Sequence, residues 1–332
     1  MKTIFFSTHD FERKYLTYWT EKLEIDSVFL DIRLSEETLG LIKDADSISC
    51  WASDDLSRGI LESLKNLGIK FISLRSAGFS HLDLDFAKDN NFSVARVPSY
   101  SPEAIAEHTL GLLMCLNRKF PRAFQRVKDF NFSLEGLEGV TLHGKNIGIV
   151  GVGKIGEAFA RIMKGMGCHI YFFDPTINEK LAKELDAQYV DLKTLLETSD
   201  VVSLHCPLNE KTKHLINKDT IELLKNDAFL LNTGRGALIE TQALIDKLKK
   251  KDLRGVGLDV YEYEESIFSY DHSLEGISDE KLLRLMSFPN VLITSHQAFF
   301  TSEALDNIAS ISCENIKNFN ENLPIDEQNV LC

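Results

Sequence analysis

The stretch from Gly148 to Pro175, GIVGVGKIGEAFARIMKGMGCHIYFFDP, constrains the fold more than any other part of the chain. An apolar run leads into Gly151, Gly153 and Gly156 in the G-x-G-x-x-G spacing, and a helical pattern and a second apolar run follow. The first glycine allows a tight turn, the second lets the backbone approach a pyrophosphate, and the third lets the helix pack closely on the sheet. The N–H groups that begin the helix then face the anion. The stretch therefore predicts a strand–helix–strand unit that binds a dinucleotide.

Asp174 adds information about which dinucleotide is bound. It stands 18 residues after Gly156, at the expected end of the second strand, and no Lys or Arg follows it until Lys180. A carboxylate there can accept hydrogen bonds from both adenosine ribose hydroxyls and repels a 2′-phosphate, so the sequence favours NAD over NADP. The glycine motif alone also fits an ordinary glycine-rich turn. The strands, the helix and the spaced aspartate around it are what favour a cofactor site.

Strand-like runs alternate with helical patterns along the chain, which predicts parallel sheets with helices on both faces. These runs lie at 2–7, 26–31, 46–51, 70–77, 92–97, 146–151, 168–174, 187–191, 200–207, 228–234, 254–261 and 290–296. With 332 residues, the chain is longer than one core usually serves. We therefore expect an α/β protein with two doubly wound, Rossmann-like domains. A terminal helix at 301–324 is expected to pack back on the first domain.

Composition and charge argue against several kinds of partner. The formal net charge of −13 repels a phosphate backbone, so no nucleic-acid partner is expected. No apolar run reaches the roughly 18 residues of a membrane span, so no membrane partner is expected, and the N-terminus does not read as a signal peptide. The cysteines show neither C-x-x-C nor metal-ligand spacing, which predicts reduced thiols, a cytoplasmic location and no metal site. They are Cys50, Cys115, Cys168, Cys206, Cys313 and Cys332.

The segment SPEAIAEHTLGLLMCLNRKF (101–120) predicts one long helix, with Ser101 as its N-cap and Pro102 in its first turn. Its apolar residues occupy most faces, so we expect the helix to be buried. Such a helix also suits an interface between subunits. We therefore expect a homo-oligomer, either a homodimer or a homotetramer.

Three ionisable residues follow three different predicted strands. Arg235 lies in NTGRG, Glu264 in DVYEYEES and His296 in SHQAF. The carboxyl ends of parallel strands share one edge of a sheet, so these side chains could converge there. Hydride reduction of a ketone needs such a set. A histidine can donate the proton, a carboxylate can orient that histidine and favour its charged form, and an arginine can grip a substrate carboxylate.

Each of these residues also has an ordinary structural explanation when it is taken alone. Arg235 fits a surface or ion-paired arginine, and His296 fits a structural histidine with satisfied hydrogen bonds. Glu264 fits a solvated acid, because Glu262 and Glu265 are near it. Glu262 also stays open as the partner of the histidine.

Taken together, the motifs resemble those of the D-isomer-specific 2-hydroxyacid dehydrogenases, and within that family the D-lactate dehydrogenases. The resemblance implies an oxidoreductase that reduces pyruvate to D-lactate with NADH. It also implies an NAD-binding Rossmann domain at 100–298 and a discontinuous, flavodoxin-like substrate domain at 1–99 and 299–332. The matching segments span nearly the whole chain in the family's order: LRSAGFSHLDLD (74–85), VPSYSPEAIAEHTLGL (97–112), GVGKIG (151–156), DVVSLHCPLNEKTKHLIN (200–217), NTGRGALI (232–239), GLDVYEYE (257–264) and SHQAFFTSEAL (295–305).

By the same resemblance, Arg235 binds the substrate, Glu264 pairs with the histidine, and His296 is the acid/base. The implied substrate-binding residues are Trp51, Ala77, Gly78, Tyr100, Arg235, His296 and Phe299. The implied cofactor-binding residues are Gly151, Gly153, Lys154, Ile155, Gly156, Asp174, Cys206, Pro207, Thr212, Thr233, Gly234, Arg235 and Asp259. One position departs from a related pattern, because Ser295 stands where proline precedes the histidine.

Two alternative functions stay open. The enzyme could reduce bulkier 2-oxo acids, branched or aromatic, although the bulky Trp51, Tyr100 and Phe299 favour a small substrate. From a different class, corepressors of transcription share this fold, bind NAD and keep the same three ionisable residues, yet act mainly as dimeric scaffolds. Turnover of pyruvate distinguishes an enzyme from such a scaffold.

Overall fold

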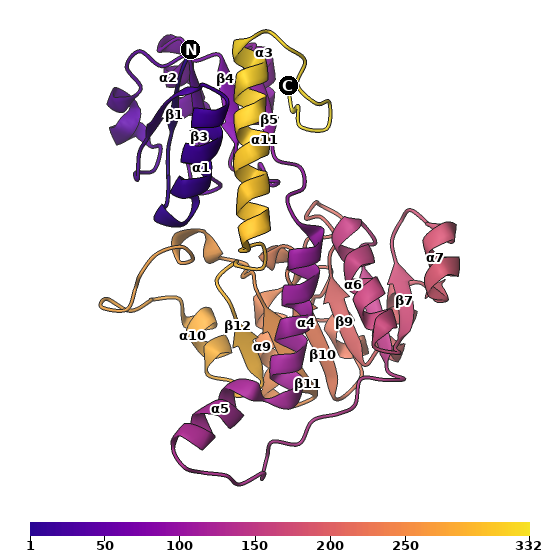
Figure 1. Ribbon diagram of the computed structural model, residues 1–332. Helices are drawn as coiled ribbons and strands as arrows, with labels where there is room; N and C mark the ends of the chain where they lie inside the picture. The colour runs from indigo at the N-terminus through magenta and orange to yellow at the C-terminus, as the bar shows by residue number, and fades with distance from the viewer. The chain divides into compact units, whose positions relative to one another are not determined.

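The computed structural model describes residues 1–332, apart from the side chain of Ser266. The chain folds into two compact units. The first contains Met1–Ser101 and Phe300–Cys332, and the second contains Pro102–Phe299 (Figure 1). Each unit has its own parallel sheet and its own buried core.

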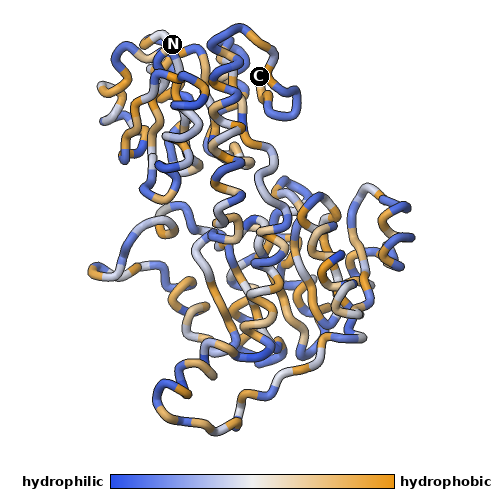
Figure 2. Tube along the Cα trace, viewed as in Figure 1, coloured by the Kyte–Doolittle hydropathy of each residue, from blue (hydrophilic) through white to orange (hydrophobic). Residues whose placement is uncertain are grey.

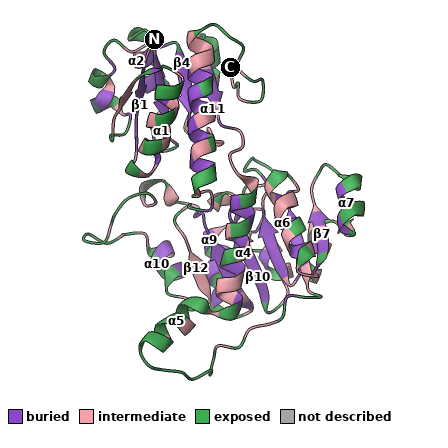
Figure 3. Ribbon diagram, in the orientation of Figure 1, coloured by how far each residue is buried: buried purple, intermediate pink, exposed green. Residues whose placement is uncertain are grey.

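The first unit is built on a five-stranded parallel sheet in the order β2-β1-β3-β4-β5. Strands β3 and β4 are buried along their whole length, because helices cover both faces of the sheet (Figure 3). Helices α2 and α3 pack on one face, and α1 and α11 pack on the other. The elements are β1 (Lys2–Phe5), α1 (Asp10–Lys22), β2 (Asp26–Phe29), the 3-10 helix η1 (Glu36–Leu41), β3 (Ser47–Cys50), α2 (Arg58–Asn66), β4 (Phe71–Leu74), α3 (Leu84–Asp89), β5 (Ser93–Arg96) and α11 (Ser302–Asn320).

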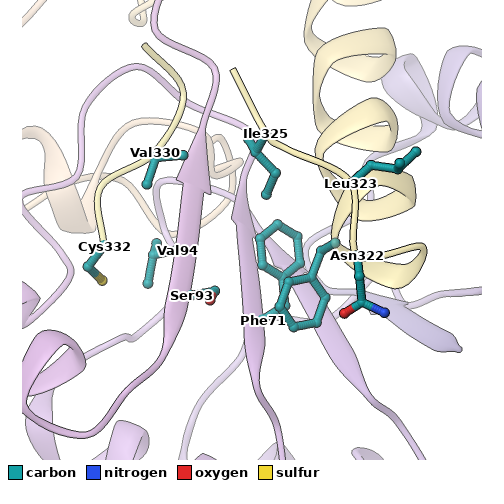
Figure 4. Close-up of a pocket in the computed structure, with 9 residues that line it drawn as sticks. Phe71, Ser93, Val94, Asn322, Leu323, Ile325, Val330 and Cys332 are labelled. Carbon is teal, nitrogen blue, oxygen red and sulfur yellow. The ribbon is translucent and has the colours of Figure 1, made fainter. Parts of the chain in front are cut away.

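The C-terminal tail covers the edge of this sheet at β5. The amide of Leu331 donates to the carbonyl of Val94, and the amide of Val94 donates to the carbonyl of Cys332, each at 2.8 Å. An apolar hollow of about 420 Å³ lies between the tail, the sheet and the end of α11, with Phe71 and Val330 in its lining (Figure 4). Because the tail takes up hydrogen-bonding groups of β5, they are not open to another strand.

The second unit is built on a seven-stranded parallel sheet in the order β12-β11-β10-β9-β6-β7-β8. The neighbours β6 and β9 are not consecutive in the chain. The strand order reverses between them, and ligand sites in such sheets form at this point. The elements are α4 (Pro102–Arg118), α5 (Phe120–Lys128), β6 (Asn146–Val150), α6 (Lys154–Gly165), β7 (His169–Phe173), α7 (Glu179–Leu185), β8 (Ala187–Tyr189), α8 (Leu192–Thr198), β9 (Val201–Leu204), η2 (Thr220–Leu223), β10 (Ala228–Asn232), η3 (Gly236–Leu238), α9 (Thr241–Lys249), β11 (Leu253–Leu258), η4 (Glu264–Ser266), α10 (Glu280–Met286) and β12 (Val291–Ile293).

The predicted fold class is confirmed, because both sheets are parallel and lie in an α/β arrangement. The prediction of one helix over 101–120 is wrong at its end. Helix α4 stops at Arg118, Lys119 is left-handed with φ of 52°, and α5 begins at Phe120. Pro121 explains the break, since it lacks the N–H needed to continue a helix but suits the first turn of a new one. Helix α5 itself buries none of its residues.

A buried ion pair stabilises the first unit. Arg75, which follows β4, is 1% exposed and donates to both carboxylate oxygens of Glu12, at 3.0 and 3.1 Å. Its guanidinium also donates to the carbonyl of Phe6 at 2.6 Å and the hydroxyl of Ser49 at 3.1 Å. Removing one member of such a pair leaves an uncompensated charge in the interior, which costs about 3–5 kcal/mol.

Arg75→Leu should therefore lower the free energy of unfolding of the first unit by about 3–5 kcal/mol, because Glu12 stays buried without its partner. Adding Glu12→Leu should recover part of the loss. Denaturation in urea, followed by circular dichroism, measures both effects. The control is Arg58→Leu, which removes an exposed pair with Glu62 and should change stability little. Equal losses from Arg75→Leu and Arg58→Leu would contradict the prediction.

Candidate active site

The glycine loop between β6 and α6 has the geometry that a dinucleotide requires. Gly151 has φ of +90°, and a Cβ there would also collide with the backbone of Cys206. A Cβ on Gly156 would collide with the carbonyl oxygen of Gly151, so α6 can approach the loop this closely only without a side chain. Gly153 faces open space and directly precedes the first residue of α6. The loop therefore leaves room for a pyrophosphate at a helix N-terminus.

Asp174 follows β7 and fixes the other side of this loop. Its Oδ2 accepts the amide of Val152 at 2.8 Å, and its Oδ1 accepts the amide of Thr176 at 2.7 Å. Each carboxylate oxygen has a second lone pair, so the side chain can still accept ribose hydroxyls. The residues of the loop thus fit NAD, while the contacts of Asp174 to the ribose and of Gly153 to the phosphates stay predictions.

The other predicted cofactor residues follow β9 and β10 or begin α6. Thr212 donates its hydroxyl to the carbonyl of Pro207 at 2.6 Å, which closes the turn after β9. The hydroxyl of Thr233 lies 2.9 Å from that of Thr109 on α4. Lys154 and Ile155 form the first turn of α6, and Gly234 precedes Arg235. These segments all follow the carboxyl ends of strands in one parallel sheet. They therefore lie at the same edge of that sheet as the glycine loop.

Glu264 and His296 form an acid–imidazole pair at this edge. Nδ1 of His296 lies 2.6 Å from Oε1 of Glu264, and Oε2 accepts the amide of Tyr261 at 2.6 Å. An ionised carboxylate can only accept, so Nδ1 carries the proton of this hydrogen bond. The histidine side chain is 40% exposed. Nε2 is therefore the ring nitrogen left to exchange a proton with a substrate.

Glu262, the other candidate partner of the histidine, is engaged elsewhere. Its Oε1 lies 2.7 Å from Nε2 of His214, and its Oε2 accepts the amide of Thr241 at 3.0 Å. Burial would raise the pKa of Glu262, but the hydrogen bonds from Thr241 and His214 hold it below its usual value. Glu262 therefore joins the segment after β11 to the segments around His214 and α9.

Arg235 is exposed at the carboxyl end of β10. Asn232 shapes the loop that carries it, donating Nδ2 to the carbonyl of Arg235 at 2.9 Å and accepting the amide of Gly234 at 3.1 Å. A Cβ on Gly236 would collide with the peptide between Tyr261 and Glu262. The Arg235 loop thus packs directly on the segment that leads to Glu264.

Asp259 has a structural role that the sequence does not reveal. Its carboxylate is fully buried and accepts the amides of Gln297 at 2.9 Å and Ala298 at 2.8 Å. It also accepts the hydroxyl of Thr294, and its own carbonyl accepts the amide of His296 at 2.7 Å. The side chain therefore contacts the backbone that follows His296 and the hydroxyl of Thr294. A contact to the cofactor stays a prediction.

The first unit carries four predicted substrate residues. The amide of Trp51 donates to buried Asp54 at 2.6 Å, and its ring lies 5.6 Å from the guanidinium of Arg75. The carbonyl of Ala77 accepts Arg96 at 2.7 Å, which orients the amide of Gly78 in the opposite direction. The carbonyl of Tyr100 accepts Asn307 at 2.8 Å. In the second unit, Phe299 directly follows Ala298, whose amide Asp259 holds.

Other histidines are poor candidates for the acid/base. Burial lowers the pKa of His205 to about 4, and its Nε2 is hydrogen-bonded to Ser203 at 2.8 Å. Burial likewise lowers the pKa of His81 to about 4. Both rings are therefore neutral near pH 7 and do not serve as proton donors there.

Among the described residues, no group of three His, Cys, Asp or Glu side chains is arranged to hold a metal ion. None of their helices has both the length and the apolar character needed to cross a membrane.

Comparison with known proteins agrees with this geometry. The model of the D-isomer specific 2-hydroxyacid dehydrogenase NAD binding domain matches residues 110–298. D-lactate dehydrogenase of Escherichia coli (strain K12) is 46% identical over 318 residues, which are 96% of both chains. 2-Hydroxyacid dehydrogenase A of Aspergillus oryzae is 46% identical over 322 residues, 96% of this chain and 92% of the relative. The solved structure of the pyruvate reductase of Chlamydomonas reinhardtii has a TM-score of 0.93 and 37% identity, covering 98% of each chain.

These matches extend over nearly the whole chain, so the resemblance found in the motifs is confirmed. The matched domain is an NAD-binding domain, which confirms the cofactor predicted from the glycine loop and Asp174. The chain therefore belongs to the D-isomer-specific 2-hydroxyacid dehydrogenases, a family of NAD-dependent oxidoreductases.

Proposed function

We propose that this protein reduces pyruvate to D-lactate and oxidises D-lactate in the reverse direction. The observation that carries the proposal is the hydrogen bond between Glu264 and His296, at the edge of a sheet whose glycine loop fits NAD. The choice of pyruvate is supported by two relatives, a D-lactate dehydrogenase and a pyruvate reductase.

His296 is proposed to be the acid/base. When bound at the glycine loop, NADH would supply the hydride for the carbonyl carbon of the substrate. His296 donates the Nε2 proton to the carbonyl oxygen, and in the reverse direction it removes the proton from the hydroxyl group. Glu264 holds the ring through Nδ1, which leaves Nε2 for the substrate.

Arg235 is proposed to bind the carboxylate of the substrate. Its exposed guanidinium can form two parallel hydrogen bonds to a carboxylate, which fixes the orientation of the carbonyl group. We propose further substrate contacts from Phe299 and, in the first unit, from Trp51, Ala77, Gly78 and Tyr100. The oriented amide of Gly78 suits a substrate carboxylate.

Wild-type protein should reduce pyruvate with NADH faster than it reduces a branched 2-oxo acid or phenylpyruvate. Chiral chromatography should identify the product as D-lactate. NADPH should be a poor substitute, because the Asp174 carboxylate repels its 2′-phosphate. Faster turnover of a bulky acid would favour the alternative substrate class, and no turnover of any 2-oxo acid would contradict the proposed activity.

Glu264→Gln should lower kcat for pyruvate, up to about 10²-fold for a small displacement of a reacting group. The substitution keeps the shape of the side chain, but a carboxamide can donate as well as accept, so it no longer holds His296 in one orientation as the carboxylate does. The measurement is steady-state kcat and KM for pyruvate. Arg235→Lys is the contrasting variant, since it keeps the charge but loses the two-pronged grip and should mainly raise KM for pyruvate. An unchanged kcat in Glu264→Gln would show that Glu264 does not orient the histidine.

We also propose that the protein is a cytoplasmic homodimer that associates through α5 and residues 129–134, here called the α5 arm. The arm exposes large apolar side chains, including Phe130 at 85% and Leu134 at 82%. Figure 2 shows the mixed hydropathy of this segment, and Figure 3 shows α5 coloured mostly as exposed. It also carries Arg122, Arg126 and Lys128, whereas the whole chain has a net charge of −13. The acidic remainder of a second copy therefore complements the basic arm in charge, and pairing would remove the apolar side chains of the arm from water. The six free cysteines fit a reducing compartment.

Phe130→Asp combined with Leu134→Asp should shift the protein from dimer to monomer, because two charges replace apolar contacts. Light scattering coupled to size exclusion measures the mass. Leu274→Asp, which changes an even more exposed leucine on another loop, is the control and should leave the mass unchanged. A monomeric wild type, or a dimer that survives both substitutions in the arm, would contradict this proposal.

A further inference from the structure

His108 on helix α4 reaches the segment that carries His296. Its Nε2 lies 3.1 Å from the hydroxyl of Thr294 and 3.4 Å from Oδ1 of Asp259. These groups belong to three separate parts of the second unit: α4, the end of β11 and the residues after β12. The imidazole thus joins the helix to the loop of the proposed acid/base.

The direction of the hydrogen bonds follows from counting protons. Thr294 has one hydroxyl proton, and it donates that proton to Oδ1 of Asp259. Its oxygen can therefore only accept from His108, so Nε2 of His108 must carry a hydrogen. The order of donation is His108 to Thr294 to Asp259.

The last acceptor in this series, the carboxylate of Asp259, also binds the backbone around His296. Asp259 accepts the amides of Gln297 and Ala298, and its carbonyl accepts the amide of His296. His296 itself has φ of 54°, a left-handed conformation that is unfavourable for a non-glycine residue. The hydrogen bonds to Asp259 hold the amides of His296, Gln297 and Ala298 in this stretch of backbone.

The ionisation of Asp259 agrees with this arrangement. Burial would raise the pKa of its carboxyl group, but hydrogen bonds from His108, Thr294 and the amides of Ala298 and Gln297 hold it below the usual value. The carboxylate is therefore charged near neutral pH and can accept from all of these donors. Losing one donor leaves a buried charge less well satisfied.

We propose that His108 is a positioning residue, which fixes the backbone at Thr294–Ala298 through Thr294 and Asp259 and thereby holds the ring of His296 against Glu264. This inference rests on the proposed role of His296. His108 acts through the other residues and not on the substrate, so its loss should affect the orientation of the ring more than the binding of ligands.

The test compares His108→Leu, which removes the donor, with His108→Gln, whose side-chain amide places an N–H near the position of Nε2. His108→Leu should lower kcat for pyruvate, up to about 10²-fold for a small displacement of a reacting group. The dissociation constant of NADH, measured by fluorescence, should stay close to that of wild type. His108→Gln should restore most of kcat. His169→Leu, at an exposed position on β7, is the control and should match wild type.

A spectroscopic measurement separates positioning from general damage. In protein labelled with ¹⁵N-histidine, the ring signals of His296, assigned with His296→Ala, should show the Nδ1–H form that Glu264 imposes. His108→Leu should weaken that signature and His108→Gln should retain it. If His108→Leu does not fold, Thr294→Val, which removes the relay hydroxyl, should give the same spectral change.

Wild-type kcat and an unchanged His296 spectrum in His108→Leu would overturn the proposal. A loss of kcat without a spectral change, or without rescue by His108→Gln, would overturn it as well. If wild type itself turned over no 2-oxo acid, the proposed function would fail. The spectra of His296 would still decide whether His108 positions that ring.

Discussion

An ionised carboxylate removed from water must find hydrogen-bond donors, and Asp259 finds them on separate segments of the second unit. The donors come from α4 and from the residues after β12, not from the neighbours of Asp259 in the chain. Because the charge is satisfied only when those segments are in place, the residue links the packing of the unit to the placement of His296. The reactive edge of the sheet is thus organised around a group that is itself inaccessible.

The turn after β11 directs two neighbouring glutamates to different histidine partners. Glu262 and Glu264 are two residues apart, yet one binds His214 and the other binds His296. Glu262 also accepts the amide of Thr241. The backbone of Gly236 packs against the peptide between Tyr261 and Glu262, in the same turn. The loop of Arg235 packs on the turn after β11, and His296 is hydrogen-bonded to Glu264 in that turn. Contact with the same turn favours a fixed distance between the two proposed functional groups.

The sequence predicted the features that depend on local pattern. The strands, the α/β class and the glycine loop with Asp174 follow from periodicity and spacing, and the structure has them at the expected places. It did not predict the break at Lys119, which depends on Pro121 inside an otherwise helical stretch. The residue pattern alone left both Glu262 and Glu264 open, and Glu264 was predicted only through the family resemblance. The link from His108 to Asp259 was not predicted, because it depends on contacts between segments far apart in the chain. The roles of the site residues stay predictions.

The C-terminal tail has a practical consequence for handling the protein. The carbonyl of Cys332 accepts the amide of Val94, so Cys332 is part of the hydrogen-bonded edge of a sheet. An affinity tag or a fused partner attached there would begin inside that edge and compete with its pairing. Met1 is half exposed and precedes the first strand, which makes the amino terminus the better place for a label.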